Sequence, residues 1–318
     1  MSSLTVPDSL EPLTEPRSER SRTRWTSLRS AGAAMRAYIA LTKPNIIWLL
    51  LVTTVPAMAV ANEGWPSTWL VTATLLGGML TAGGANAINQ YADRDIDARM
   101  ERTRGRPLPS GAVPARHALT LGVALAALGT AWLMLTVNGA AAALALAAVV
   151  WYAAVYSYLL KHSTSQNIVI GGVAGAMPPL IGWAAVTGDV SAASLLLFLI
   201  VVNWTPPHFW ALSLLLADDY RAAGVPMLPV VRGEAETARQ ILLYSYVVVG
   251  LTFAFWAVAG LSLIYLAASS GGGAIFVWLA LQLRADTSAA RARRLFKHST
   301  LYLALLFGAM FLDQLLLG

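Results

Sequence analysis

Residues 69–92 read WLVTATLLGGMLTAGGANAINQYA and contain no charged side chain. Charges crowd immediately afterwards, in the stretch DRDIDARMERTRGR at 93–106. A helix needs about 20 mainly apolar residues to cross the hydrocarbon core of a bilayer. We therefore expect 69–92 to be a membrane-spanning helix whose end emerges into a charged loop.

The same pattern recurs along the chain and dominates its composition. Hydrophobic residues make up 57% of the sequence and charged residues 12%, whereas soluble domains have about 45–50% and 25%. The mean hydropathy is +0.61, and there is no cysteine. This composition excludes a soluble enzyme, a disordered chain, a disulfide framework and a thiolate metal site. Nine apolar stretches predict nine transmembrane helices: 44–60, 69–92, 117–137, 140–160, 167–186, 192–216, 239–258, 261–283 and 299–317.

The basic residues give the orientation. The net charge of +6 and the pI of about 9.8 are also typical of proteins that bind nucleic acid. All 22 Lys and Arg residues, however, lie before the first span or in alternate connections, which places them on one side of the membrane. Such residues mark the cytoplasmic side. We therefore expect a multi-pass protein of the bacterial cytoplasmic membrane, with its N-terminus in the cytoplasm and its C-terminus outside. Membrane lipids surround it, and no nucleic-acid partner is expected.

The first 37 residues differ from the rest. They are rich in Ser, Pro, Arg, Glu and Thr, which predicts a mobile cytoplasmic tail over 1–37. No apolar run precedes Ile46, so we expect no signal peptide, and four acidic residues argue against a mitochondrial presequence. Residues 38–318 are predicted to form a single transmembrane domain.

A stripe of polar residues ends the span at 69–92. At 3.6 residues per turn, Asn89, Asp93 and Asp97 lie on one side of the helix, each about 6 Å along the axis from the last. Carboxylates this close repel one another unless a cation lies between them. Mg²⁺ takes oxygen ligands and usually binds through one or two carboxylates plus substrate phosphates. The alternative is a solvated helix end on which the acids pair with Arg94 and Arg99.

A second polar cluster lies on the span at 192–216. Pro206 and Pro207 interrupt it, His208 follows in mid-span, and Asp218–Asp219 close it. Membranes tolerate broken helices where the freed backbone is buried in protein or lines a cavity. The two acidic helix ends are four spans apart, which suggests two halves sharing a site. The predicted fold is thus an all-α polytopic bundle of nine helices around a central cavity that opens to the cytoplasm.

Five sequence blocks resemble the UbiA superfamily of intramembrane prenyltransferases. The first is Asn89-x-x-x-Asp93-x-x-x-Asp97 with the Glu101–Gly111 stretch, and it is typical of the superfamily as a whole. The others are similar to its haem-farnesylating branch and are more specific: Gln166-Asn-Ile-Val-Ile-Gly-Gly, Ala176-Met-Pro-Pro-Leu-Ile-Gly-Trp183, Pro206-Pro-His-Phe-Trp210 and Asp219-Tyr-Arg-Ala-Ala-Gly-Val-Pro-Met-Leu-Pro229. Together these blocks cover roughly residues 40–235. Many superfamily members carry a second Asp-x-x-x-Asp. Here the residues four positions after Asp218 and Asp219 are Ala222 and Ala223, so the motif is missing, as in the haem branch.

The resemblance implies a UbiA-like fold and a prenyl transfer. It implies that a farnesyl group passes from farnesyl diphosphate to a vinyl group of haem B, with water added, to give haem O and diphosphate. Mg²⁺ is the implied cofactor, and a haem A synthase is a candidate recipient of the product. By position the implied roles are catalysis and metal binding for Asn89, Asp93 and Asp97, metal binding for Asp219, diphosphate binding for Arg94, Arg102, Arg106 and Lys161, and haem binding for His208. The aromatic faces of Tyr156, Trp204, Phe209 and Trp210 are candidates to stabilise carbocations.

Three other functions are compatible with parts of this sequence, and each would require a further feature. A UbiA-type transferase that prenylates an aromatic acid or quinone precursor would share the first block but not the last two. A transporter would place charged or polar residues through the midplane, whereas the acids here gather at one face. A haem-carrying subunit would need paired axial histidines, and of the four histidines only His208 lies deep in a predicted span.

Overall fold

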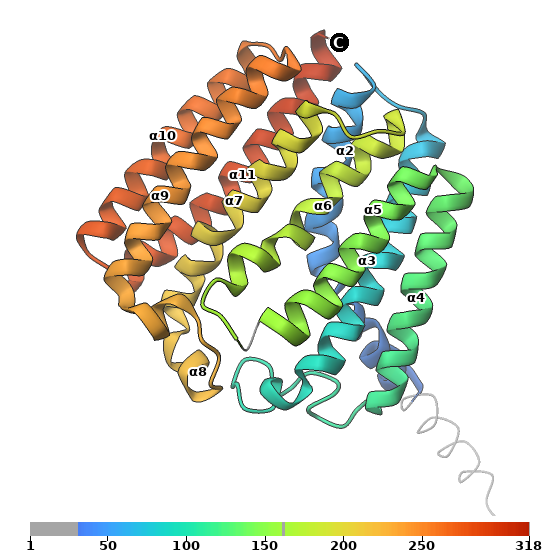
Figure 1. Cartoon of the computed structure of the whole chain (residues 1–318), viewed down its shortest axis with the longest axis vertical. Helices are drawn as coiled ribbons and strands as arrows, with labels where there is room; N and C mark the ends of the chain where they lie inside the picture. The colour runs from blue at the N-terminus through green and yellow to red at the C-terminus, as the bar shows by residue number, and fades with distance from the viewer. Residues whose placement is uncertain (1–30, 161–162, 318) are drawn as a thin grey trace, which may run out of the picture.

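The computed structural model describes residues 31–160 and 163–317, and among these it has helices and no strands (Figure 1). The described part of the predicted tail, residues 31–37, belongs to a helix over 31–42. The later elements are α2 (Pro44–Ala61), α3 (Thr68–Asp97), α4 (Ala115–Thr136), α5 (Gly139–Val150), the π-helical segment η1 (Trp151–Leu160), α6 (Asn167–Thr187), α7 (Ala192–Leu215), α8 (Ala217–Ala222), α9 (Leu228–Ala259), α10 (Leu263–Ala285) and α11 (Ala289–Leu317).

The predicted membrane bundle is confirmed. Within the described ranges, eight helices are long and apolar enough to cross a membrane, and α5 with η1 counts as one of them. The remaining predicted span, 44–60, corresponds to α2, whose section Val52–Ala61 is a shorter apolar helix. Three helices extend past their predicted spans into the charged connections, because α3 runs on to Asp97, α9 starts at Leu228 and α11 starts at Ala289. This is therefore a multi-pass membrane protein.

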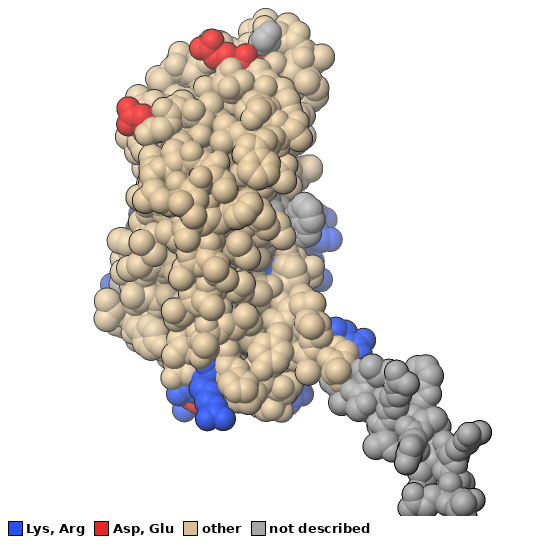
Figure 2. Space-filling model, turned by 90° about the vertical axis from the view of Figure 1, so that its right-hand side faces the viewer, with Lys and Arg blue, Asp and Glu red and all other residues tan. Residues whose placement is uncertain are grey.

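The two ends of the bundle are built differently. Four helices, α3, α5, α7 and α10, start at the end where the C-terminus lies (Figure 1), and each has a Ser or Asn side chain that accepts a hydrogen bond from its first turn: Ser67, Asn138, Ser191 and Ser262. Such caps satisfy amide groups that the start of a helix leaves without partners. On the face shown in Figure 2, acidic residues but no basic ones lie at this end, and the basic residues lie over the other half. The basic end of the bundle is also where the polar stripe of α3 ends.

Helices α3 and α4 cross in close contact because glycines remove the side chains between them. A Cβ atom added to Gly84 would lie 2.6 Å from both the Ala126 nitrogen and the Gly122 oxygen of α4. Gly122 and Gly129 face α3 in the same way, with added Cβ atoms 2.7 Å and 2.8 Å from their nearest neighbours. Small residues at such crossings let the backbones of membrane helices approach. This contact fixes the helix that carries the acidic stripe.

We expect Gly84→Ala to lower the apparent Tm of the detergent-purified protein, because the added methyl group meets backbone atoms that cannot turn aside. Overpacking of this kind costs about 1–3 kcal/mol. The matched control is Gly250→Ala in α9, where an added Cβ meets nothing within 4 Å. Equal melting temperatures for the two variants would contradict the close crossing.

The remaining contacts bring the two halves together. Helix α2 packs against α3 and α6, α6 against α7, and α7 against α9, while α11 contacts α2, α7 and α10. Figure 1 shows the end of α3, the start of α6, α8 and the start of α9 at the same end of the bundle. Four polar segments that are far apart in sequence therefore lie around one end of the apolar bundle.

Candidate active site

The acidic stripe of α3 is buried. Asn89, Asp93 and Asp97 are each 2% exposed, although they sit at the charged end of the helix. The Asn89 amide nitrogen donates to Asp93 Oδ2 at 2.8 Å and to the Ser157 hydroxyl of η1 at 2.9 Å. Asn89 thus pairs with Asp93 on α3 and links α3 to Ser157 of η1.

Lys43 completes this group, although its sequence position indicated only that it marks the cytoplasmic side. Its Nζ donates to Asn89 Oδ1 at 2.9 Å. Its backbone is left-handed (φ 53°, ψ 59°), which is uncommon for a residue other than glycine, and Pro44 starts α2 directly after it. Strained backbone of this kind tends to occur at functional sites. A lysine immediately before the first span was the one signal in the sequence.

Asp97 has a different partner. Arg106, which the sequence assigned to the diphosphate, donates from Nη1 to Asp97 Oδ2 at 2.7 Å. The Asp97 side chain is 3% exposed and that of Arg106 is 27% exposed. The Thr103 hydroxyl also donates to the Asp97 carbonyl at 2.9 Å. These bonds fold the loop at 98–114 back under the end of α3.

Asp219 lies across from this loop on α8. Its Oδ1 accepts a hydrogen bond from the Glu101 backbone amide at 3.1 Å. The neighbouring Tyr220 hydrogen-bonds Arg102, and burial raises the pKa of Tyr220, partly offset by the Arg102 charge. The structure therefore brings Asp219 to the site as an anchor for the loop that carries Arg102 and Arg106.

The other predicted cations are placed differently. The Arg94 guanidinium turns back to the Tyr91 carbonyl at 2.9 Å and lies 4.7 Å from the centre of the Tyr91 ring, with Asp95 at 3.8 Å. Lys161 lies outside the described residues. Among the described cations, Lys43 and Arg106 are the two that bond to the acidic stripe.

The aromatic candidates separate into two groups. Tyr156 of η1 stacks on Tyr152 with ring centres 5.6 Å apart, and both interact electrostatically with Asp93. Gly171 of α6 leaves room for Tyr156, since a Cβ there would lie 2.3 Å from its ring. Trp204, Phe209 and Trp210 belong to α7 instead.

His208 faces α11. Its Nδ1 lies 2.8 Å from the Ser299 hydroxyl, and its ring stacks between Trp204 at 4.3 Å and Phe296 at 4.6 Å. Phe209 meets the same ring edge-on at 5.2 Å. Trp210 is fully buried and packs edge-on against Tyr244 of α9. His208 is thus part of an aromatic cluster between α7 and α11, and no hydrogen bond described for it reaches the acidic stripe.

The donor set at Asn89 and Asp93 suits a hard cation. Among the described residues no three His, Cys, Asp or Glu side chains come close enough to hold a metal alone. The oxygen ligands present are the buried Asp93 carboxylate and the Asn89 carboxamide oxygen, which accepts a hydrogen bond from Lys43. They still match Mg²⁺, which takes few protein ligands and shares the rest with substrate phosphates. The residues present therefore fit Mg²⁺ bound together with a diphosphate.

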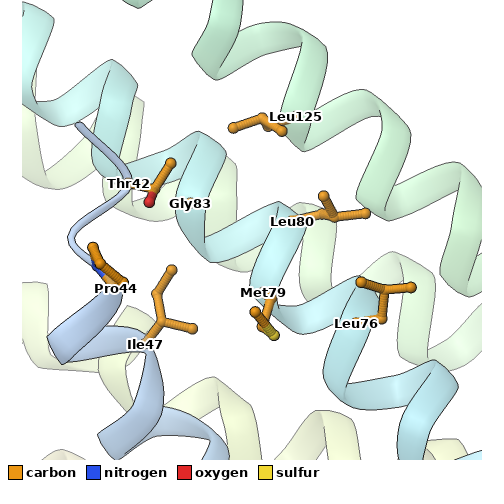
Figure 3. A pocket seen from close by; sticks show the side chains of 8 residues that line it. All are labelled: Thr42, Pro44, Ile47, Leu76, Met79, Leu80, Gly83 and Leu125. Atoms are coloured by element: carbon orange, nitrogen blue, oxygen red, sulfur yellow. The ribbon is translucent and has the colours of Figure 1, made fainter. Parts of the chain in front are cut away.

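A lipid-facing groove lies beside the site. It holds about 170 Å³ between the start of α2, α3 and α4. Figure 3 shows its lining, which includes Thr42 and Pro44 on either side of Lys43 in the chain. Leu76 and Met79 in this lining are exposed on the outer surface of the bundle. The groove thus opens away from the acidic stripe.

Comparisons with known proteins agree with this architecture. The model of the UbiA prenyltransferase family matches residues 50–306. A protoheme IX farnesyltransferase of Roseiflexus castenholzii is 49% identical over 91% of this chain and 54% of the relative. One of Streptomyces avermitilis is 48% identical over 91% of this chain and 96% of the relative. The chain thus spans about half the length of the first relative and nearly all of the second.

Two solved structures share the fold. A digeranylgeranylglyceryl phosphate synthase superimposes with a TM-score of 0.75 at 17% identity, over 88% of this chain and 98% of the other. A UbiA homologue from Archaeoglobus fulgidus bound to DMAPP and Mg²⁺ gives a TM-score of 0.61 at 17% identity, over 86% and 98%. On the family match over residues 50–306 and the 48–49% identity to relatives named protoheme IX farnesyltransferases, the chain belongs to the UbiA prenyltransferase family.

Proposed function

We propose that this protein transfers a farnesyl group from farnesyl diphosphate to a vinyl group of haem B, with addition of water, and releases haem O and diphosphate. The observation that carries the proposal is the buried Asn89–Asp93 pair with Lys43, because it joins oxygen ligands to a cation at the charged end of an apolar bundle. The activity named for the relatives at 48–49% identity supports the same reaction.

The proposed binding of the diphosphate follows from the charges. Asn89 and Asp93 would hold Mg²⁺, and the bound ion would neutralise the charge that develops on the leaving diphosphate. The A. fulgidus homologue, bound to Mg²⁺ and a prenyl diphosphate, supports this use of the metal. Asp97 is the second acid of the stripe and is proposed as a further metal ligand, and Asp219 on α8 is proposed as a ligand from the opposite side of the site. Positive charge for the phosphates is proposed to come from five basic residues: Lys43, Arg94, Arg102, Arg106 and Lys161.

The proposed reaction proceeds in two bond-forming steps. The C1–oxygen bond of farnesyl diphosphate breaks, and the allylic carbon gains cationic character next to the stacked rings of Tyr152 and Tyr156. The terminal vinyl carbon of haem B donates its π electrons to C1. The cation left on the carbon beside the porphyrin is quenched by water, which keeps the hydroxyl and releases one proton. His208 is proposed to contact the haem, and the apolar surroundings keep water from C1 until the new bond has formed.

Placement in the cell is part of the proposal. On the face shown in Figure 2 the basic residues lie over the half of the bundle that carries the site, and we propose that this end faces the cytoplasm of a bacterial cell and that the C-terminus lies outside. Farnesyl diphosphate then reaches the site from the cytoplasm or its leaflet. Haem O stays in the membrane, from which a haem A synthase is proposed to take it.

The reaction can be tested with the purified full-length protein. We expect incubation with haem B, farnesyl diphosphate and Mg²⁺ to give a haem heavier by one farnesyl group plus one hydroxyl group, detected by mass spectrometry. Removal of the divalent cation by EDTA should stop product formation, and added Mg²⁺ should restore it. Unchanged haem, together with a prenylated aromatic acid in a parallel assay, would instead favour a transferase for quinone precursors.

A further inference from the structure

A polar hollow of about 380 Å³ lies between the connection that precedes α6 and the first turns of α9. Its polar lining comes from three consecutive residues on one side and three residues of α9 on the other: Thr164, Ser165, Gln166, Arg232, Glu236 and Gln240. Both segments lie at the end of the bundle that carries the acidic stripe (Figure 1). The reaction proposed above uses none of these six side chains.

The single acid in the hollow is already neutralised. Glu236 accepts two hydrogen bonds of 2.7 Å from Arg239 and one of 2.8 Å from Gln240. These bonds lower the pKa of Glu236 to about 2, so it remains ionised and paired with Arg239 at physiological pH. Glu236 therefore has its counter-charge outside the hollow.

Arg232 is the charge that remains. It makes no hydrogen bond or ion pair with any residue in the described part of the chain. The reason lies in Gly233, whose backbone (φ 79°, ψ 172°) interrupts α9, so that Arg232 and Glu236 are not on successive turns of one regular helix. That conformation is essentially restricted to glycine. Its charge acts on Glu236 only at longer range, where it adds slightly to the lowering of the Glu236 pKa. The hollow thus presents a guanidinium without a hydrogen-bond partner in the described residues, together with hydroxyl and amide groups.

We propose that this hollow binds a propionate of the porphyrin substrate, with Arg232 as its counter-charge and the hydroxyls of Thr164 and Ser165 as hydrogen-bond donors. A guanidinium matches the geometry of a carboxylate and binds it strongly. Thr164 Oγ1 accepts a hydrogen bond from the Gln166 amide, which leaves its own proton available to a ligand. The inference rests on the proposed function, because it assumes that haem B is the substrate.

Haem B carries its reactive and its acidic groups apart from each other. Its vinyl and propionate groups are on different edges of the macrocycle, so a vinyl group at the prenyl diphosphate requires the propionates to lie away from it. The chain makes the same separation. Ser157 of η1 bonds to Asn89 at the acidic stripe. Thr164, seven residues later in the sequence, lines the hollow. A flat substrate beside this stretch can have its reactive edge at one site and its acidic edge at the other.

The test compares Arg232→Gln with Arg293→Gln, which removes an exposed cation of α11 at the same end of the bundle. Haem B and haem B dimethyl ester, whose propionates carry no charge, are titrated into the full-length proteins in nanodiscs of a zwitterionic lipid. We expect Arg232→Gln to weaken binding of haem B about tenfold, as for the loss of a charge-assisted hydrogen bond. The ester should bind equally to all three proteins, and Arg293→Gln should bind haem B like the wild type.

Three outcomes of the binding titrations would overturn the inference. One is equal affinity of Arg232→Gln and wild type for haem B, and another is an equal loss for haem B and its ester. The third is a loss that appears only in nanodiscs with phosphatidylglycerol, which would assign Arg232 to an anionic lipid headgroup. Failure of the wild type to prenylate haem B would refute the proposed function. Normal prenylation with the same KM for haem B in Arg232→Gln would refute this inference alone.

Discussion

Asp93→Ala is expected to abolish prenyl transfer, with a loss of at least about 10³-fold in kcat, while the protein stays folded and still binds haem B. Asp93 is 2% exposed and hydrogen-bonded to Asn89, so its carboxylate is held in place at the proposed metal site. Removing one preorganised group that stabilises transition-state charge costs about 10²–10³-fold, and loss of a metal ligand adds to this. The measurement is haem O formation against time, with haem binding followed separately by absorbance.

The control for this experiment lies two residues along the same helix. Asp95 is an acid of the same span, but its side chain is 77% exposed and its nearest cation, Arg94, is 3.8 Å away. Asp95→Ala should therefore retain near wild-type turnover and Mg²⁺ dependence. Full activity of Asp93→Ala, with the divalent cation chelated, would refute the metal–diphosphate site on α3.

Arg106→Gln is expected to lower both stability and turnover. It leaves the buried carboxylate of Asp97 without its 2.7 Å partner, and breaking a buried pair costs about 3–5 kcal/mol. Adding Asp97→Asn to this variant removes the carboxylate charge that has lost its partner. We therefore expect Arg106→Gln/Asp97→Asn to recover most of the apparent Tm but not the activity, because an acid of the stripe is gone.

The same loop supplies a matched control. Arg104 pairs with Glu101 at 3.9 Å, and both side chains are exposed, at 69% and 86%. Exposed pairs contribute about 0–1 kcal/mol, so Arg104→Gln should change neither Tm nor turnover. A double variant no more stable than Arg106→Gln would show that Arg106 supports the loop by some contact other than the Asp97 pair.

The spans were predictable because hydropathy and helix period are local properties. The stripe of Asn89, Asp93 and Asp97 follows from its spacing, and the structure shows all three buried on α3. The partners of these residues were not predictable from spacing. Lys43 reaches Asn89 from 46 residues away through a left-handed backbone, and nothing in a hydropathy profile indicates that conformation.

The charged loop shows the same limit more sharply. Arg102 and Arg106 of this loop, with Arg94 just before it, were assigned to the diphosphate by position, since a sequence gives the charge of a side chain but not its direction. In the structure, Arg106 pairs with Asp97, Arg102 bonds to Tyr220, and Arg94 turns back on Tyr91. Which cation meets which acid depends on how α8 and the loop fold together, and that contact joins residues more than a hundred positions apart, as between Glu101 and Asp219.

The π-helical turns of η1 set the register of the site. In a π-helix the hydrogen bonds join residues five positions apart instead of four, so each such turn holds an extra residue. Within these turns the Ser157 side-chain hydroxyl donates to the Tyr152 carbonyl five positions earlier, and the same hydroxyl accepts a hydrogen bond from the Asn89 side-chain amide. A chain one residue shorter here would still cross a bilayer, since Gly139–Leu159 has 21 residues. It would, however, rotate Tyr156 and Ser157 by about 100° relative to α5. Anchoring in the membrane therefore tolerates such a deletion, whereas the alignment of these side chains with α3 does not.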